Sequence, residues 1–198
     1  MGEGEAMRSG GKKVIFYFMS FLPLLLVIPS PLLPLWSFQL NAPLYGQKWL
    51  TVVVHPLWGV SGDLQEINIV NHYVGLGRIG NEEIQEIAYL PYVYLLSISL
   101  AILSTAAFHL KKRRLGKLSL SLRILLVLSL YLYVYLWLYN YTHTITPGAA
   151  IKIEPFDPPF IGEHRVANFV IRSFPDLSLA LLTVSPLIEL FNAYRLKR

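Results

Sequence analysis

The chain has 198 residues, of which 54% are hydrophobic and 15% are charged, and its formal net charge is +5. Soluble domains carry about a quarter charged residues, so this composition argues against a soluble domain and indicates lipid as part of the surroundings. The sequence contains no cysteine, which excludes disulfides, zinc–thiolate sites and cysteine-bound iron–sulfur clusters. At this length we expect a single membrane domain over residues 1–198.

Four apolar segments are long enough to cross a bilayer, which takes about 20 residues of helix. They lie at about residues 14–36, 87–110, 118–139 and 174–194. Pro29, Pro31 and Pro34 crowd the end of the first segment, so its helix is expected to break near Ile28. Lys12 and Lys13 before an apolar run also fit a signal peptide. No small-x-small cleavage site follows, so an uncleaved span is favoured.

Two long polar loops, 37–86 and 141–172, separate the apolar segments. Within the first loop, Trp49–His55 is rich in β-branched residues and predicts a strand. Asp63 with Glu66 three residues later is a capping-box pattern, which predicts a short helix starting at Leu64. The predicted fold is therefore an all-α membrane protein. It would be a four-helix transmembrane bundle with a small α/β extracytoplasmic cap formed by the two long loops.

The distribution of basic residues predicts the orientation in the membrane. Lys and Arg number 3 in the amino-terminal tail, 6 in residues 111–123 and 3 in the carboxyl-terminal tail, against five in the two long loops. Cytoplasmic segments carry the excess of Lys and Arg. We therefore expect a multi-pass protein of the cell membrane, with both termini cytoplasmic and both long loops outside. The lipid bilayer is the expected partner, and nucleic acid is not.

The most polar stretch of the first loop, residues 61–77, predicts a candidate site. Residues 63–72 hold Asp63, Glu66, Asn68, Asn71 and His72. If residues 64–73 are helical, Asn68 and His72 share a face, and His143 would lie at the same membrane level. Imidazole with amide or carboxylate oxygen suits copper, zinc or iron. The predicted metal ligands are His72 and His143, helped by Asn68, Asn71 or Asp63.

The structural alternative for these residues is that they serve as hydrogen-bonded supports for the fold. No H-E-x-x-H or comparable metal spacing is present. A second stripe, Tyr131, Tyr135, Tyr139 and His143, repeats at four-residue steps in the third span. It fits either an aromatic belt with helix packing, which is favoured, or a redox chain or quinone wall. Glu189 is expected to pair with Arg195 or another cytoplasmic base, and Arg123 to snorkel.

The loop motifs resemble a largely uncharacterised family of small multi-pass membrane proteins of bacteria and archaea. The resemblance rests on Gly62-Asp-Leu-x-Glu66-Ile-Asn68-x-x-Asn71-His72-Tyr73-x-Gly75, Tyr139-x-Tyr141-x-His143, Ile151-Lys-Ile-x-Pro155-Phe-x-Pro158-Pro159-x-Ile161-Gly162, Ala167-Asn168-Phe169 and Ala42-Pro43-x-Tyr45. It implies a loose association with copper-dependent nitrous oxide reduction or other respiratory functions, and no established activity. Thr142 stands where the relatives have Gly, and residues 144–147 lack the Asp that precedes the Pro in the relatives.

The functional expectation is an integral membrane accessory protein with a polar, histidine-bearing site on its outer face. It would handle a transition metal such as copper, or assist a respiratory oxidoreductase, with that complex or a metal-delivery protein as its partner. The alternative is a non-catalytic structural subunit of a membrane respiratory or oxidase complex. An enzyme acting at the lipid surface is the third and least favoured interpretation.

Overall fold

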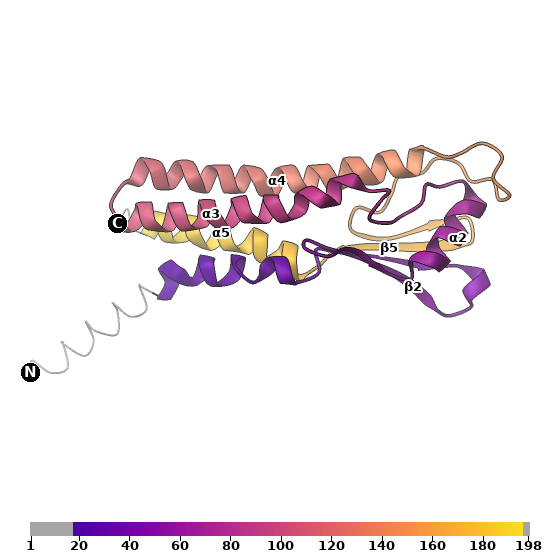
Figure 1. Ribbon diagram of the computed structural model, residues 1–198, viewed down its shortest axis with the longest axis horizontal. Coiled ribbons are helices and arrows are strands. Elements are labelled where there is room, and N and C mark those ends of the chain that lie inside the picture. The colour runs from indigo at the N-terminus through magenta and orange to yellow at the C-terminus, as the bar shows by residue number, and fades with distance from the viewer. Residues whose placement is uncertain (1–17, 196–198) are drawn as a thin grey trace, which may run out of the picture. The chain divides into compact units, whose positions relative to one another are not determined.

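The computed structural model of the protein describes residues 18–195 and contains a five-stranded antiparallel sheet (Figure 1). The strands are β1 (Trp36–Asn41), β2 (Trp49–His55), β3 (Gly59–Gly62), β4 (Gly162–Val166) and β5 (Phe169–Pro175), in the order β3-β2-β1-β5-β4. The predicted all-α class, a four-helix bundle with a small cap, is therefore wrong. The sheet joins segments from both ends of the sequence, because β1 pairs with β2 on one side and β5 on the other.

The helices occupy most of the remaining described chain. Residues 18–27 are helical, and the later helices are α2 (Leu64–Val74), α3 (Leu90–His109), α4 (Arg113–His143) and α5 (Leu177–Arg195). Short 3-10 turns are η1 (Ser30–Leu32) before β1, η2 (Pro43–Tyr45) between β1 and β2, and η3 (Gln85–Tyr89) before α3. The strand predicted at Trp49–His55 and the helix predicted from Leu64 are both confirmed.

Two predicted spans give way to strands at their ends. The first was predicted to run to Trp36 and the fourth to start at Phe174, but Trp36 begins β1 and Phe174 lies in β5. The two residues sit in one antiparallel ladder, in which Trp36 pairs with Pro175. The Trp36 indole also donates a hydrogen bond of 2.8 Å from Nε1 to the Ser173 hydroxyl. Backbone pairing between distant segments thus overrides the local apolar signal.

Three helices are long and apolar enough to cross a membrane: Gln85–His109, Arg113–His143 and Leu177–Tyr194. Phe18–Leu32 forms a shorter apolar helix, and the predicted start of the first span, residues 14–17, lies outside the described residues. Helix α4 has 31 residues where the prediction had 118–139. At about 1.5 Å per residue it is about 46 Å long, which exceeds the roughly 30 Å of a bilayer's hydrocarbon core.

The described chain divides into two compact units. The helical unit contains residues 18–30, 95–127 and 181–195, and the sheet unit contains residues 31–94 and 128–180. Helices α3, α4 and α5 each contribute residues to both units. In the sheet unit, the buried core includes Leu50, Val52, Val60, Ile67 and Ile84. Helix α2 contributes its buried face to this core and packs against β2.

The helical unit contains a buried ion pair. The Arg123 guanidinium donates from Nη1 to Glu189 Oε2 at 2.5 Å and from Nη2 to the Ser185 hydroxyl at 2.6 Å. Ser185 in turn donates to the Pro23 carbonyl at 2.7 Å. Arg123 is fully buried, so the prediction that it snorkels is wrong. Glu189 was expected to pair with Arg195 or with another cytoplasmic base, and its partner is Arg123.

Candidate functional site: an apolar cavity in the sheet unit

Asp63, the first of the predicted ligands, lies immediately before α2. Its carboxylate accepts a 2.9 Å bond from the Thr51 backbone N–H and a 2.9 Å bond from Lys48 Nζ. The Thr51 N–H and then the Lys48 ammonium lower the pKa of Asp63 below its ordinary value of 3.8. Although Asp63 occupies the N-cap position, its side chain makes no capping bond. Both oxygens thus tie β2 to the start of α2.

Asn68, the second predicted ligand, clamps the segment that follows α2. Its Oδ1 accepts the Ile79 backbone N–H at 2.7 Å, and its Nδ2 donates to the Ile79 carbonyl at 2.9 Å. This pair imitates one rung of a β-ladder and satisfies both backbone groups of Ile79. The side chain therefore serves the fold, as the structural alternative proposed.

Gly75 connects the polar motif to the second loop. It ends α2 in the left-handed conformation, with a φ of 79°, and an added Cβ would lie 2.8 Å from the Thr146 carbonyl oxygen. The Thr146 N–H donates to the Gly75 carbonyl at 2.7 Å, and the Ile151 N–H donates to the Tyr73 carbonyl at 2.9 Å. Glycine is required here both by its φ and by this close approach.

The two predicted histidine ligands have different surroundings. His72 is exposed on α2, with its ring edge-on to Tyr73. His143 ends α4, where its ring stacks on Tyr139 at 3.9 Å between centroids and its Nδ1 lies 2.8 Å from the Tyr139 carbonyl. Within residues 18–195, no three His, Asp or Glu side chains are grouped so that they could hold a metal ion. Copper binding therefore stays a prediction.

The tyrosine stripe of α4 packs against the second loop. Tyr131 and Tyr135 meet the Phe160 ring edge-on, at 6.3 and 5.8 Å between ring centroids, and Tyr131 also contacts Trp36 at 6.5 Å. These contacts support the helix-packing interpretation of the stripe.

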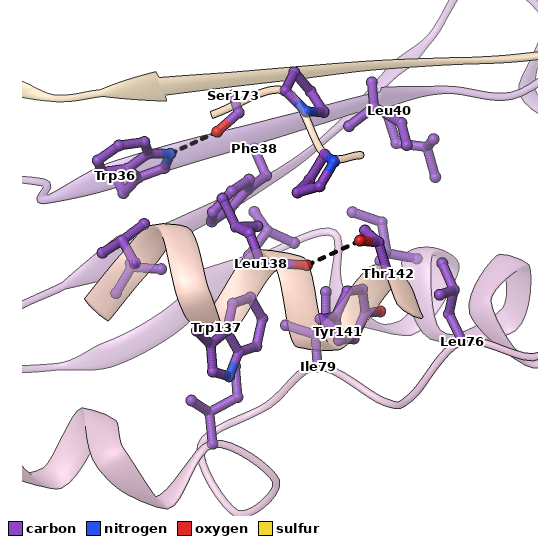
Figure 2. Close-up of a pocket in the computed structure, with 18 of the residues that line it drawn as sticks. Trp36, Phe38, Leu40, Leu76, Ile79, Trp137, Leu138, Tyr141, Thr142 and Ser173 are labelled. Atoms are coloured by element: carbon purple, nitrogen blue, oxygen red, sulfur yellow. Dashed lines mark hydrogen bonds between the residues drawn. The ribbon is translucent and has the colours of Figure 1, made fainter. Parts of the chain in front are cut away.

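The sheet unit contains a partly open apolar cavity of about 170 Å³. Figure 2 shows Trp36, Phe38 and Leu40 on the strand side, and Trp137, Leu138 and Tyr141 on α4. Residues of β2, β3, β4, β5, α2 and the segments 76–90 and 153–159 also line it. The cavity is therefore built from elements that lie more than a hundred residues apart in the sequence.

Three hydroxyl groups in the cavity wall form hydrogen bonds within the protein. The Thr142 hydroxyl donates to the Leu138 carbonyl at 3.1 Å, and the Ser173 hydroxyl accepts the Trp36 indole N–H, both drawn in Figure 2. The Tyr141 hydroxyl donates to the Gly77 carbonyl at 2.8 Å. Asn71 differs, because it is 5% exposed and its Nδ2 has no hydrogen-bond partner within residues 18–195.

Of the predicted ligands, Asn71 alone lines this cavity. Comparison of the chain with protein-family models, curated proteins and solved structures found no match. The family resemblance of the loop motifs therefore stays a prediction, and the site is argued from its own residues. Sequence reasoning missed the cavity, although the alternation of Trp36, Phe38 and Leu40 with polar residues was a signal that one face of β1 is buried.

Proposed function

We propose that the protein is an integral membrane protein whose sheet unit binds the hydrocarbon portion of a lipid, with a carbonyl or ester oxygen of that lipid accepting a hydrogen bond from Asn71. The observation that carries this proposal is an apolar cavity whose wall holds a single unpartnered buried donor, Asn71 Nδ2. Metal handling is less well supported, because the carboxylate of Asp63 and the amide of Asn68 are committed to the fold.

The volume of the cavity supports an apolar occupant. A dry cavity of about 150 Å³ lined by aliphatic and aromatic side chains accommodates benzene. The volume here, about 170 Å³, accommodates a segment of acyl or prenyl chain similar in volume to benzene. An apolar occupant removes this apolar lining from water, which is favourable.

The single donor supports an occupant that carries one acceptor. A buried polar group without a partner costs about 1–3 kcal/mol. Water is a poor occupant, because a buried water needs about two to four polar partners, and the other buried hydroxyls of the wall bond within the protein. An ester or ketone oxygen next to a hydrocarbon chain satisfies Asn71 while its apolar part fills the remaining volume.

The surroundings of the sheet unit supply such a ligand. Three helices long enough to span a membrane contribute residues to this unit, and the bias of basic residues supports an outer location for the long loops. Under this proposal the lipid comes from the outer leaflet, and both termini are cytoplasmic. Helix α4 is longer than the hydrocarbon core, so its last turns carry the cavity wall beyond the hydrocarbon layer.

The test is binding of a fluorescent fatty-acyl ester to the full chain in detergent, with two variants that fill the cavity. Leu76→Trp and Val134→Phe enlarge lining residues on different walls. Leu44→Trp is the matched control, because Leu44 is 76% exposed and does not line the cavity. We expect saturable binding that falls at least about tenfold in both filling variants, a loss of roughly 1.4 kcal/mol, and is unchanged in the control.

Two results would contradict the proposal. One is the absence of saturable binding to the wild-type protein after delipidation. The other is wild-type affinity in both filling variants, provided that their melting temperatures show that they are folded. Mass spectrometry of lipids that remain bound after purification identifies the natural occupant.

A further inference from the structure

The helical unit contains a second cavity with the opposite chemistry. Its volume is about 490 Å³, within the range of about 300–1,000 Å³ that is typical of small-molecule sites. We call it the basic cavity, and its charged and polar lining residues are Ser20, Thr105, His109, Lys111, Arg113, Lys117, Glu189 and Asn192. They come from the helix at residues 18–27, α3, the turn that follows α3, α4 and α5.

Positive charge dominates the lining of the basic cavity. Lys111, Arg113 and Lys117 are exposed cations. Within residues 18–195, no ion pair neutralises Lys111 or Lys117. The single acid of the wall, Glu189, is already matched by the Arg123 guanidinium at 2.5 Å. The positive charge of Lys111 and Lys117 therefore favours an anion, and phosphate is an anion that both Lys and Arg bind well.

The buried part of the wall offers hydrogen-bonding groups that have no partner. Glu189 is 3% exposed, and its Oε1 is unpartnered while Oε2 accepts from Arg123. Ser104 also approaches this carboxylate, but its hydroxyl donates to the Ala101 carbonyl at 3.1 Å. Thr105 is 6% exposed, and its Oγ1 has no partner within residues 18–195. A ligand hydroxyl can donate to Glu189 and exchange a bond with Thr105.

From this combination we propose that the basic cavity binds a glycerol phosphate group. The phosphate contacts Lys111, Arg113 and Lys117, and a free hydroxyl of the glycerol donates to Glu189 Oε1. Two sources offer this chemistry: the head group of a phosphatidylglycerol lipid and a soluble glycerol phosphate. This site is independent of the apolar cavity, because it is lined by residues of the helical unit alone.

The first experiment separates a built site from general attraction to basic residues. Binding of phosphatidylglycerol to the full chain in detergent is measured by native mass spectrometry for two double variants. Lys111→Gln with Lys117→Gln removes two lining cations, whereas Lys112→Gln with Arg114→Gln removes two neighbouring cations that do not line the cavity. Both lower the net charge by the same amount. We expect about a tenfold or larger loss for the lining pair and less than about a twofold change for the control pair.

The second experiment tests the hydroxyl. Phosphatidylethanol has the same charge as phosphatidylglycerol but no free hydroxyl, so it keeps the phosphate contacts and loses the donor to Glu189. We expect phosphatidylglycerol to bind about fivefold or more tightly, and Thr105→Val to reduce this preference because it removes the neighbouring hydroxyl at nearly constant volume. Titration with soluble glycerol 3-phosphate identifies the source. Saturable binding indicates a soluble ligand, and binding of the lipid alone indicates a head-group site.

Either of two outcomes overturns the proposal. Equal losses in the two double variants would mean that the lipid responds to net charge and not to this cavity. Equal affinity for phosphatidylglycerol and phosphatidylethanol in the wild-type protein would remove the role of the hydroxyl and of Glu189. Neither outcome affects the acyl-ester binding proposed for the sheet unit, so the two proposals fail separately.

Discussion

Among the described residues, the two units differ in whether they bury charged side chains. In the sheet unit the core is aliphatic, with Leu50 and Val52 at 0% and 1% exposure. In the helical unit the buried set includes Arg123 and Glu189, while large apolar side chains such as Leu125, Leu187 and Phe191 are more than half exposed. Helices that expose leucine and bury charge are favoured where the surroundings are apolar. The contrast is compatible with a helical unit that is surrounded by lipid and a sheet unit that is organised around its own core.

The same contrast extends to the cavities. The wall of the apolar cavity satisfies nearly all its buried polar atoms within the protein and leaves one amide donor, Asn71 Nδ2. The wall of the basic cavity keeps exposed cations and two unpartnered buried oxygens. Unsatisfied groups, more than cavity size, therefore determine which ligand each unit can accept, since an unmade buried hydrogen bond costs more than a made one contributes.

The largest expected effect tests the polar core of the helical unit. Glu189→Leu leaves the Arg123 guanidinium buried without its anion, and should lower the free energy of unfolding by about 3–5 kcal/mol. The measurement is thermal or denaturant unfolding of the full chain in detergent. Adding Arg123→Leu to this variant should recover much of the loss, because apolar side chains replace both charges.

Leu122→Ala serves as the control for this comparison, because Leu122 neighbours Arg123 in the sequence and is 44% exposed. It should cost far less than Glu189→Leu. If Glu189→Leu were no more destabilising than Leu122→Ala, the helical unit would not depend on its buried charges, and the contrast between the units would lose its basis.

The next effect concerns the clamp made by Asn68 in the sheet unit. Asn68→Leu leaves the N–H and carbonyl of Ile79 without their partners, and should lower the free energy of unfolding by about 1–3 kcal/mol. Gln65→Leu is the matched control, since Gln65 is exposed on the same helix. Equal stability of the two variants would show that solvent replaces the clamp, and would reopen a ligand role for Asn68.

Substitution of Asn71 is expected to have a smaller effect on stability, and the effect should be stabilising. Asn71→Leu removes the unpartnered Nδ2 at similar volume, and should raise the stability of the delipidated protein by about 1 kcal/mol. The same variant should lose the preference for an acyl ester over an alkane chain of equal length. Fluorescence competition with both ligands measures this preference. A destabilised variant that still prefers the ester would contradict the assigned role of Asn71.

Local signals allowed the sequence to predict part of this structure. The β-branched run Trp49–His55 and the start of α2 at Leu64 were correctly predicted, because strand propensity and helix boundaries depend on neighbouring residues. The strands β1 and β5 were missed because their pairing joins Trp36 to Pro175. At residue 36 the apolar run looked like the end of a span, although alternation began there.

The candidate site was less predictable than the fold. The polar motif was identified as the most informative segment, but Asp63 and Asn68 turned out to bind backbone groups of Thr51 and Ile79. Only the three-dimensional arrangement separates those two from Asn71, whose side chain has the same chemistry as that of Asn68 but whose Nδ2 has no partner within residues 18–195. A cavity that combines β1, α2 and the end of α4 has no local sequence pattern.

The smallest expected effect is the pH dependence contributed by Asp63. Its pKa is lowered in the folded protein by the Thr51 N–H and by Lys48, so the native state favours the carboxylate relative to the unfolded chain. The resulting stability is fully present above the ordinary pKa of 3.8 and is lost as the pH falls through the lower folded pKa. The difference in melting temperature between wild type and Asp63→Asn should therefore be constant at neutral pH and shrink in acid.

Lys48→Gln should reduce this acid-dependent difference without abolishing it, because the Thr51 N–H remains. A difference that persists unchanged at low pH would mean that Asp63 acts through its shape and not its charge. The sheet unit would then owe none of its stability to the charge of Asp63, which would sharpen its contrast with the helical unit.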